Sequence, residues 1–187
     1  MFKQILAGLE RIDCDIVYLV EHDLLYHPSH FAFTPPTNNV FYYNENTWKV
    51  DSSNGQCLFH YTKQTSGLCA YRDLLIGHYR RRIAKLESNA RELTAQGLPV
   101  KNDGFSRNMG FEPGCHQFPR GVDNYKTERW MSPCPNVDIR HGSNLTKSRW
   151  TQAEFRDKNA CLGWTLADDV PYWGTIKGRF NEWLASL

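Results

Sequence analysis

The sequence predicts an α/β fold in which helices pack on a mixed sheet. Three observations lead to this prediction. Ile16 to Val20 is an unbroken apolar run rich in β-branched residues, which is typical of a strand buried on both faces of a sheet. Residues 2–12 carry apolar side chains at helical spacing directly before that run. Residues 73–96 show the same spacing over a longer stretch, between segments that alternate like strands.

Each predicted helix has a defined apolar stripe. The first helix places its apolar residues at Phe2, Ile5, Leu6, Leu9 and Ile12. Asp73 opens the second helix, and Gly97 followed by Pro99 closes it. Its stripe consists of Leu74, Leu75, His78, Tyr79, Ile83, Leu86, Ala90 and Leu93. The basic run at 80–82 falls within this helix and is interpreted as a solvated face.

The predicted strands surround the long helix. Residues 40–50 have the composition of one strand, Asn54-Gly55 is a strong hairpin signal, and 56–61 supply the return strand. The polar residues 44–46 either line a sugar pocket or form the wet face of the hairpin. Residues 135–141 are interpreted as another strand.

The remaining segments are a long loop and two further helices. Residues 101–136 are rich in glycine, proline and asparagine and are predicted to be a functional loop. Thr151-Gln-Ala-Glu154 is a capping-box pattern that opens a short helix through Lys158. A last helix is expected at about 174–186. The whole chain, 1–187, is predicted to be a single domain.

Composition excludes several classes of protein. The 187 residues are 41% hydrophobic and carry a net charge of only +2, which does not indicate a nucleic-acid-binding surface. The six cysteines lack the paired spacing of zinc sites. No apolar run approaches the roughly 18 residues of a membrane span, so we expect no span and a cytoplasmic location.

The acidic triplet Glu21-His22-Asp23 follows the predicted strand at 16–20. Ligands of open α/β sheets bind beyond the carboxyl ends of strands. If the strand geometry continues, Glu21 and Asp23 lie on one side and His22 on the other. Carboxylates are hard oxygen ligands that suit Mg²⁺ or Mn²⁺ held against phosphates. The alternative is a strand that ends in a solvated polar loop.

Taken in order, four motifs resemble those of nucleotide-sugar glycosyltransferases of the GT-A fold, especially family 2-like members. Glu21-His22-Asp23 resembles the Asp-x-Asp motif of that family. The segment 66–72 is similar to its small-residue loop near the donor sugar. Gly110-Phe111-Glu112 resembles the position of the acidic catalytic base. The segment 138–146 is similar to the late histidine segment.

The resemblance implies a Rossmann-like sheet and an inverting, metal-dependent transfer of a sugar from a nucleotide-diphosphate sugar to a hydroxyl acceptor. Mn²⁺ or Mg²⁺ would be the cofactor. The residues implied are Glu21, Asp23 and His141 for the metal, Glu112 as catalytic base, and Ser66, Gly67, Arg72 and His116 for the donor. From the residues alone, Glu112 before Pro113-Gly114 equally suits a turn, and a structural role equally suits His116.

The family places a nucleotide-binding half before its acidic motif, whereas this chain begins at the helix ahead of that motif. The resemblance therefore implies a domain truncated at its N-terminal side. A second chain or self-association would complete the sheet, or the chain is a fragment or an inactive relative. A non-catalytic or partner-dependent sugar-nucleotide-binding subunit is the first alternative. A hydrolase or an Fe(II) oxygenase with histidine and carboxylate ligands is the second.

Overall fold

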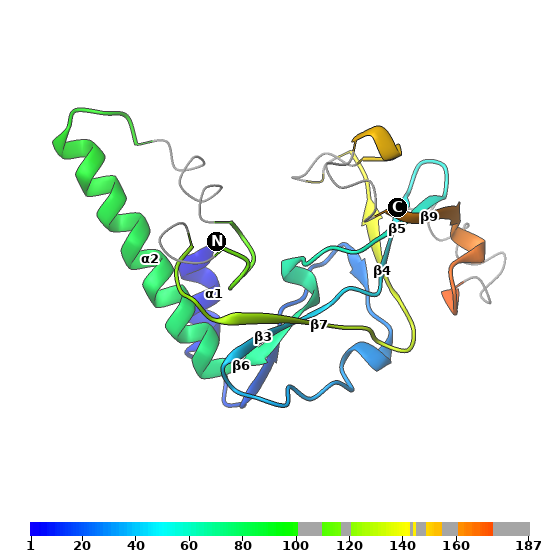
Figure 1. Ribbon diagram of the computed structural model, residues 1–187, viewed down its shortest axis with the longest axis horizontal. Coiled ribbons are helices and arrows are strands. Elements are labelled where there is room, and N and C mark those ends of the chain that lie inside the picture. Colours follow the sequence, from blue (N-terminus) through cyan, green and yellow to red (C-terminus); the bar gives the residue numbers. More distant parts are fainter. Residues whose placement is uncertain (101–109, 117–120, 143, 145–148, 155–160, 174–187) are drawn as a thin grey trace. The chain divides into compact units, whose positions relative to one another are not determined.

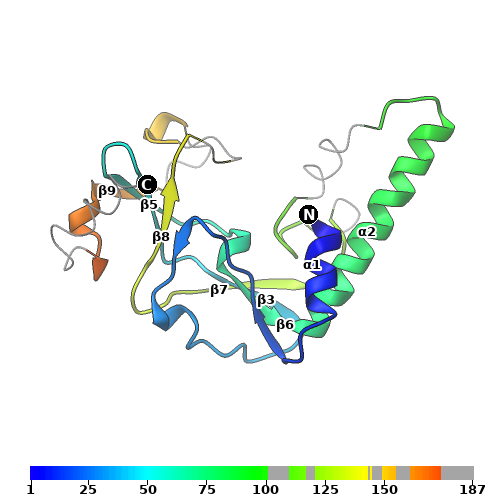
Figure 2. The same cartoon turned by 180° about the vertical axis from the view of Figure 1, so that it is seen from behind.

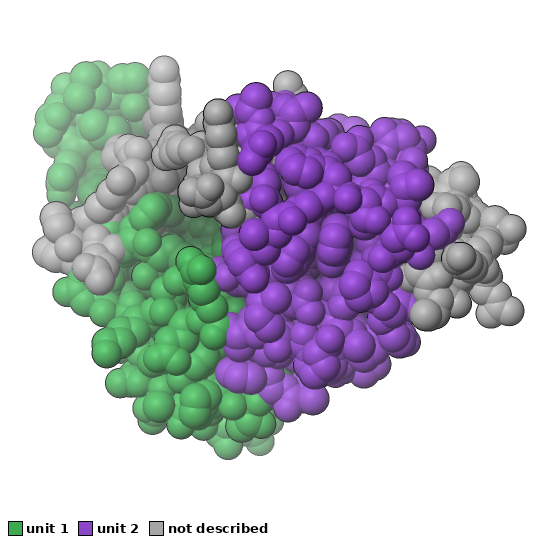
Figure 3. Space-filling view, turned by 45° about the vertical axis from the view of Figure 1, so that its right-hand side comes forward, with its two compact units in different colours: residues 1–19, 34–43, 63–129 green, residues 20–33, 44–62, 130–187 purple. Residues whose placement is uncertain are grey.

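The computed structural model describes residues 1–100, 110–116, 121–142, 144, 149–154 and 161–173. Over these residues the α/β class is confirmed, with two α-helices and two sheets. The chain divides into two compact units (Figure 3). Unit 1 comprises residues 1–19, 34–43 and 63–129, and unit 2 comprises 20–33, 44–62 and 130–187. Each unit contains its own hydrophobic core.

Unit 1 combines a four-stranded sheet with two helices. The strand order is β1 (Ile16–Tyr18), β6 (Leu68–Tyr71), β3 (Val40–Asn44) and β7 (Lys126–Trp130). β6 pairs antiparallel with both β1 and β3. The helices are α1 (Phe2–Leu9) and the longer α2 (Arg72–Ala95). They lie side by side in both ribbon views (Figures 1 and 2).

The core of unit 1 forms because the strands alternate and the helices have apolar stripes. Every second residue of β3 and β6 meets the apolar residues of α1 and α2. Its buried members are Leu9, Phe41, Tyr43, Leu68, Ala70, Leu74, Leu75, Ile76 and Tyr79. Burying one such large side chain stabilises the fold by about 1.5–3 kcal/mol.

The long helix is confirmed, with one correction on its surface. Gly97 has a φ of 68°, and the N–H of Leu98 donates to the carbonyl of Leu93 at 2.9 Å, so the predicted glycine stop is present. The basic run was expected to be solvated throughout. This is wrong for Arg82, which is only 1% exposed. Arg82 follows His78 by four residues and therefore lies on the same buried face of the helix.

Unit 2 is built on a five-stranded sheet. The strand order is β2 (Leu24–Leu25), β8 (Asn136–Arg140), β4 (Thr47–Asp51), β5 (Gln56–His60) and β9 (Cys161–Leu166). The hairpin of β4 and β5 and the strand at β8 are confirmed. β4 and β8 pair parallel. The core on one face of this sheet consists of Val50, Cys57, Val137, Ile139, Ala167 and Val170.

The segment 40–50 was predicted as one strand, and this is wrong. It forms two strands, β3 and β4, which belong to different sheets. The Asn44 carboxamide contributes to the break, because it accepts a hydrogen bond from the backbone N–H of Asn46 at 3.0 Å. Asparagine side chains that bond to the nearby backbone in this way compete with strand pairing.

The strand expected at 16–20 is shorter and less buried than predicted. β1 ends at Tyr18, its three residues are half-buried, and within the described sheet it pairs only with β6. β1 is an edge strand, so one side of its backbone has no partner strand within the described sheet.

The C-terminal half contains strands that the sequence analysis did not predict. β7 lies within the segment assigned to a loop at 101–136, and β9 lies in the tail. The Glu154 carboxylate accepts from the N–H and hydroxyl of Thr151, so the expected capping contact is present at a short 3-10 helix, Gln152–Glu154. The rest of that predicted helix, and the helix at 174–186, lie outside the described residues.

Gly114 is a position at which only glycine fits. Its φ is 74°, and an added Cβ would lie 2.7 Å from Cδ2 of Phe41 and 2.8 Å from Cγ2 of Thr127. We expect Gly114→Ala to lower the free energy of unfolding by about 2 kcal/mol, measured by urea denaturation. Gly97→Ala is the matched control, since Gly97 has φ 68° with nothing near its Cβ position. Equal losses in both variants would show that the Gly114 contacts contribute nothing.

Candidate functional site

The acidic triplet lies in the turn that leads into β2. β2 pairs antiparallel with β8, with Leu24 opposite Asp138. The backbone carbonyl of Asp23 accepts from the N–H of Ile139 at 2.8 Å. The N–H of Glu21 donates to the hydroxyl of Tyr26 at 3.0 Å. Backbone pairing therefore holds the acidic turn against the second half of β8.

β8 and β4 bring further charges to this position. Lys49 of β4 lies directly opposite Asp138 in the parallel pair. Arg140 follows Asp138 by two residues, so both lie on the same face of the strand. The Arg140 guanidinium approaches the Asp138 carboxylate at 3.4 Å, and the two side chains are 12% and 5% exposed. Carboxylates and cations thus alternate along this part of the sheet.

The pKa values of Glu21, Asp138 and Lys49 reflect both their burial and the closeness of these charges. Burial, followed by the charges of Asp23 and Asp138, raises the pKa of Glu21. Burial is the main cause that raises the pKa of Asp138, and Arg140 and Lys49 partly oppose it. Burial lowers the pKa of Lys49, although Asp138 acts in the other direction. The charged form of each of these groups is less stable here than in water. A ligand of opposite charge nearby would stabilise that charged form.

The His141 turn lies beside the acidic turn. The Asn144 side chain donates to Oδ2 of Asp23 at 2.8 Å. The other end of the same carboxamide accepts from the backbone N–H of His141. The three residues proposed for a metal, Glu21, Asp23 and His141, therefore belong to one edge of the unit 2 sheet.

The proposed donor residues belong to unit 1. Ser66 and Gly67 are buried in a 3-10 helix, Thr65–Gly67, that precedes β6. Arg72 follows β6, so four extended residues lie between it and Gly67, and the two are about 16 Å apart along the chain. Nε of Arg72 donates to the carbonyl of Leu9 at 2.8 Å, which fastens α2 to α1. Arg72 also lines a depression of about 160 Å³ with Asp15 and other polar residues.

The proposed base and the remaining donor residue share one loop of unit 1. The carbonyl of Glu112 accepts from the N–H of Cys115 at 3.2 Å, so residues 112–115 form a turn. The His116 ring packs against Gly110, where an added Cβ would lie 2.2 Å from its Cδ2 atom. Glu112 and His116 are both half-buried. Both residues lie in this one loop, which α2 contacts through the carbonyl of Gly110.

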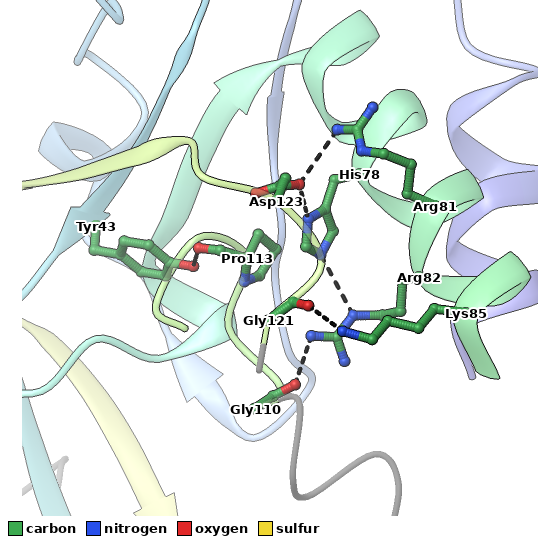
Figure 4. A network of polar contacts seen from close by, with 9 residues as sticks. All are labelled: Tyr43, His78, Arg81, Arg82, Lys85, Gly110, Pro113, Gly121 and Asp123. Atoms are coloured by element: carbon green, nitrogen blue, oxygen red, sulfur yellow. Dashed lines mark hydrogen bonds and ion pairs between the residues drawn. The ribbon is translucent and has the colours of Figure 1, made fainter. Parts of the chain in front are cut away.

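That loop is fastened by a polar network on α2 (Figure 4). Nδ1 of His78 lies 2.8 Å from Oδ2 of Asp123, and Arg81 contacts the same oxygen at 3.2 Å. Nε of Arg82 donates to Nε2 of His78 at 3.4 Å. Arg82 and Lys85 also donate to the carbonyls of Gly110 and Gly121.

The His78–Asp123 pair resembles a catalytic dyad in geometry, but the surroundings assign it to structure. His78 is 1% exposed. Because Arg82 donates to Nε2, the proton of the neutral ring resides on Nδ1 and is donated to Asp123. Neither ring nitrogen is available to a substrate. Burial lowers the pKa of His78, which favours this neutral form.

Sequence reasoning did not select Lys49, Asp138 or Asn144 as site residues. Lys49 meets Asp138 only through the parallel pairing of β4 with β8, in which paired residues are 89 positions apart in the sequence. Asp138 stands between apolar Val137 and Ile139 in the sequence. This alternation was the one signal that the Asp138 side chain lies on the face of the strand opposite to theirs. Asn144 had no signal beyond its place three residues after His141.

Comparison with known proteins does not assign this chain. No protein-family model, no curated protein and no solved structure matches it. Among the described residues, no three His, Cys, Asp or Glu side chains are grouped closely enough to hold a metal ion between them. Within the same residues, neither helix has the length and apolar character that crossing a membrane requires.

Proposed function

We propose that this chain is a metal-dependent glycosyltransferase of GT-A-like architecture, which moves a sugar from a nucleotide-diphosphate sugar to an acceptor hydroxyl with inversion. One observation carries the proposal. The acidic turn at Glu21 and Asp23, the charged residues of β8 and the His141 turn meet at one edge of a sheet. The order of these motifs along the chain matches the resemblance described above.

The carboxylates fit a divalent cation. Burial is the main cause that raises the pKa of Glu21, and repulsion by Asp23 and Asp138 adds to it. A cation would reduce this repulsion. Mg²⁺ in nucleotide-binding enzymes is commonly held by only one or two carboxylates together with substrate phosphates. Asp23 with Glu21 would hold Mn²⁺ or Mg²⁺ together with the phosphates of the substrate. His141, expected as the third ligand, does not form a three-residue ligand group with them among the described residues.

A bound cation supplies charge neutralisation on the leaving diphosphate. Lys49 and Arg140 supply positive charge from the protein itself, beside the same carboxylates. Glu112 is the residue we propose to accept the proton of the acceptor hydroxyl, a task suited to a half-buried carboxylate. Ser66, Gly67, Arg72 and His116 are the donor contacts that we propose, and Arg72 has further N–H groups beside the one that it donates to Leu9.

The first test is calorimetric titration of UDP and GDP, and then of their hexose conjugates, with and without Mn²⁺. We expect binding that requires the cation, weakened at least tenfold by Asp23→Asn, since the variant removes an anionic ligand. Asp51→Asn is the matched control, because Asp51 belongs to the same unit and its carboxylate serves the turn at Ser53. Binding that ignores Mn²⁺, or that survives Asp23→Asn unchanged, would overturn the proposal.

Transfer is tested separately from binding, by release of nucleoside diphosphate from the bound donor with water or a sugar as acceptor. Glu112→Gln should abolish release while donor affinity stays within about twofold, because it removes the base without touching the cation site. Donor binding without release in the wild type would favour the alternative, a non-catalytic or partner-dependent sugar-nucleotide-binding subunit. Undiminished release in Glu112→Gln would remove Glu112 from the mechanism.

A further inference from the structure

The side chain of Asn144 bridges two segments of unit 2 that are far apart in sequence. Its Nδ2 group donates to Oδ2 of Asp23 at 2.8 Å, across 121 positions. Its Oδ1 atom accepts from the backbone N–H of His141, and its own N–H donates to the carbonyl of His141 at 3.2 Å. Both ends of one carboxamide are therefore used, one for the acidic turn and one for the His141 turn.

We propose that Asn144 is a positioning residue that fixes the Asp23 carboxylate and ties the His141 turn to it. This inference rests on the proposed function, since it assigns Asn144 a role at the same cation site. The donor end of the amide occupies Oδ2 of Asp23 and leaves Oδ1 for a ligand. Carboxylates that bind metals are commonly oriented by such hydrogen bonds, and loss of the bond typically weakens metal affinity by about 10–100-fold.

The backbone of Asp23 is restrained by the same part of the chain. Its carbonyl accepts from the N–H of Ile139 at 2.8 Å, two residues before His141. Main chain and side chain of Asp23 are thus both held against the end of β8 and the turn that follows. A carboxylate ordered before the ligand arrives loses less side-chain entropy on binding.

The chemical nature of Asn144 suits this position. Asp23 lies near Glu21 and Asp138, as the electrostatic effects on both carboxyl groups show. A lysine or arginine in place of Asn144 would orient Asp23 too, but its positive charge would repel the cation. A carboxamide donates a hydrogen bond and adds no net charge, so the negative potential of the carboxylates is preserved.

Asn144→Asp separates the two functions of the side chain. Aspartate keeps an oxygen acceptor for the N–H of His141, but it cannot donate to Asp23 and adds a like charge beside it. If Asn144 only closes the turn, Asn144→Asp is tolerated. If it positions Asp23, this variant disturbs the carboxylate. Asn54→Asp is the control, since Asn54 also accepts a turn N–H in unit 2, from Gln56, and lies 3.5 Å from Asp51.

The first readout needs no ligand. In NMR spectra of the free chain, we expect the side-chain NH₂ protons of Asn144 to exchange slowly with solvent and to shift when Asp23 is replaced by alanine. Exposed, rapidly exchanging protons that ignore Asp23→Ala would overturn the proposal. This measurement tests the contact between Asn144 and Asp23 whether or not the chain binds nucleotides.

The second readout is Mn²⁺ affinity in the presence of nucleoside diphosphate, followed by electron paramagnetic resonance. We expect Asn144→Asp to weaken Mn²⁺ binding about tenfold and Asn54→Asp to leave it unchanged. In the Asp23→Asn background, Asn144→Asp should cost nothing further, because the two residues act as one unit. Wild-type affinity in Asn144→Asp contradicts the positioning role. Absent Mn²⁺ binding in the wild type contradicts the proposed function instead.

Discussion

Asp123→Ala is expected to lower the free energy of unfolding by about 2–3 kcal/mol, the loss typical of a buried hydrogen-bond donor that is left without its charged acceptor. The Asp123 side chain is 8% exposed and receives contacts from His78 at 2.8 Å and Arg81 at 3.2 Å. The alanine variant would leave the Nδ1–H of His78 buried without an acceptor. It would also remove a negative charge that helps to stabilise the buried Arg82 guanidinium.

The consequences extend to the loop that carries the proposed base. Arg82 donates to the carbonyl of Gly110, and Tyr43 donates to the carbonyl of Pro113 at 2.7 Å. Glu112 lies between these two anchored carbonyls. Loosening the α2 network should therefore disturb the position of Glu112 as well as the stability of unit 1.

Urea denaturation followed by circular dichroism measures the loss. Asp123→Asn keeps an oxygen acceptor for His78 but not the charge, so we expect about half the loss of the alanine variant. Asp13→Ala is the control, since Asp13 is exposed in the same unit. A loss below about 1 kcal/mol for Asp123→Ala would show that the network does not stabilise unit 1.

The same network gives unit 1 an acid sensitivity. Burial alone would raise the pKa of Asp123, but the hydrogen bond from His78, and then Arg81, hold it below the ordinary value. A carboxyl whose pKa is lower in the folded state contributes stability above its unfolded pKa and loses that stability as the pH falls below it. The Asp123 contribution should therefore be complete at neutral pH and be lost below about pH 4.

The sequence predicts local elements of this fold better than their assembly. The boundaries of α2 follow from Asp73 and Gly97, and the hairpin of β4 and β5 follows from Asn54-Gly55, because each signal acts within a few residues. The division of residues 40–50 between two sheets depends on Asn44, whose partners lie at positions 30 and 132. No local pattern contains that information.

The sequence likewise predicts only some of the residues of the candidate site. The order of the motifs predicted that Glu21, Asp23 and His141 lie together. Pairing of β2 with β8 brings the acidic turn and the His141 turn to one edge of the sheet. Lys49 joins them through the register of a parallel strand pair, which the sequence alone does not fix. Arg82 was wrongly predicted to be exposed, because a basic run usually indicates a solvated surface. The sequence does not identify the residues that bury this side chain.

The second large effect concerns His30, the centre of a buried polar cluster in unit 2. His30 is fully buried, and Nδ1 of its ring lies 2.9 Å from Nδ2 of Asn44 and 3.1 Å from Nδ2 of Asn136. Both amides are oriented by other bonds. Oδ1 of Asn44 accepts from the N–H of Ser132, and Oδ1 of Asn136 accepts from the N–H of His27. Two NH₂ donors therefore face Nδ1, which must be unprotonated.

Protonation of His30 would place an N–H group against these two donors in a site closed to water. Burial lowers the pKa of His30 from 6.5 to about 4. The unfolded chain therefore takes up a proton at this residue below pH 6.5, whereas the folded chain does not until about pH 4. The free energy of unfolding should be unaffected by His30 above pH 6.5, fall by about 3 kcal/mol between pH 6.5 and 4, and show no further loss from His30 below pH 4.

His30→Gln tests this expectation, because the glutamine carbonyl can accept from Asn44 and Asn136 but does not titrate in this range. We expect the unfolding free energy of the wild type to fall with acidity more steeply than that of the variant. The comparison removes the contribution of His78, whose lowered pKa gives a slope of the same sign in both proteins. NMR titration of the His30 ring should show a midpoint near pH 4. A midpoint between pH 6 and 7, or parallel pH profiles, would mean that the cluster tolerates the charged ring.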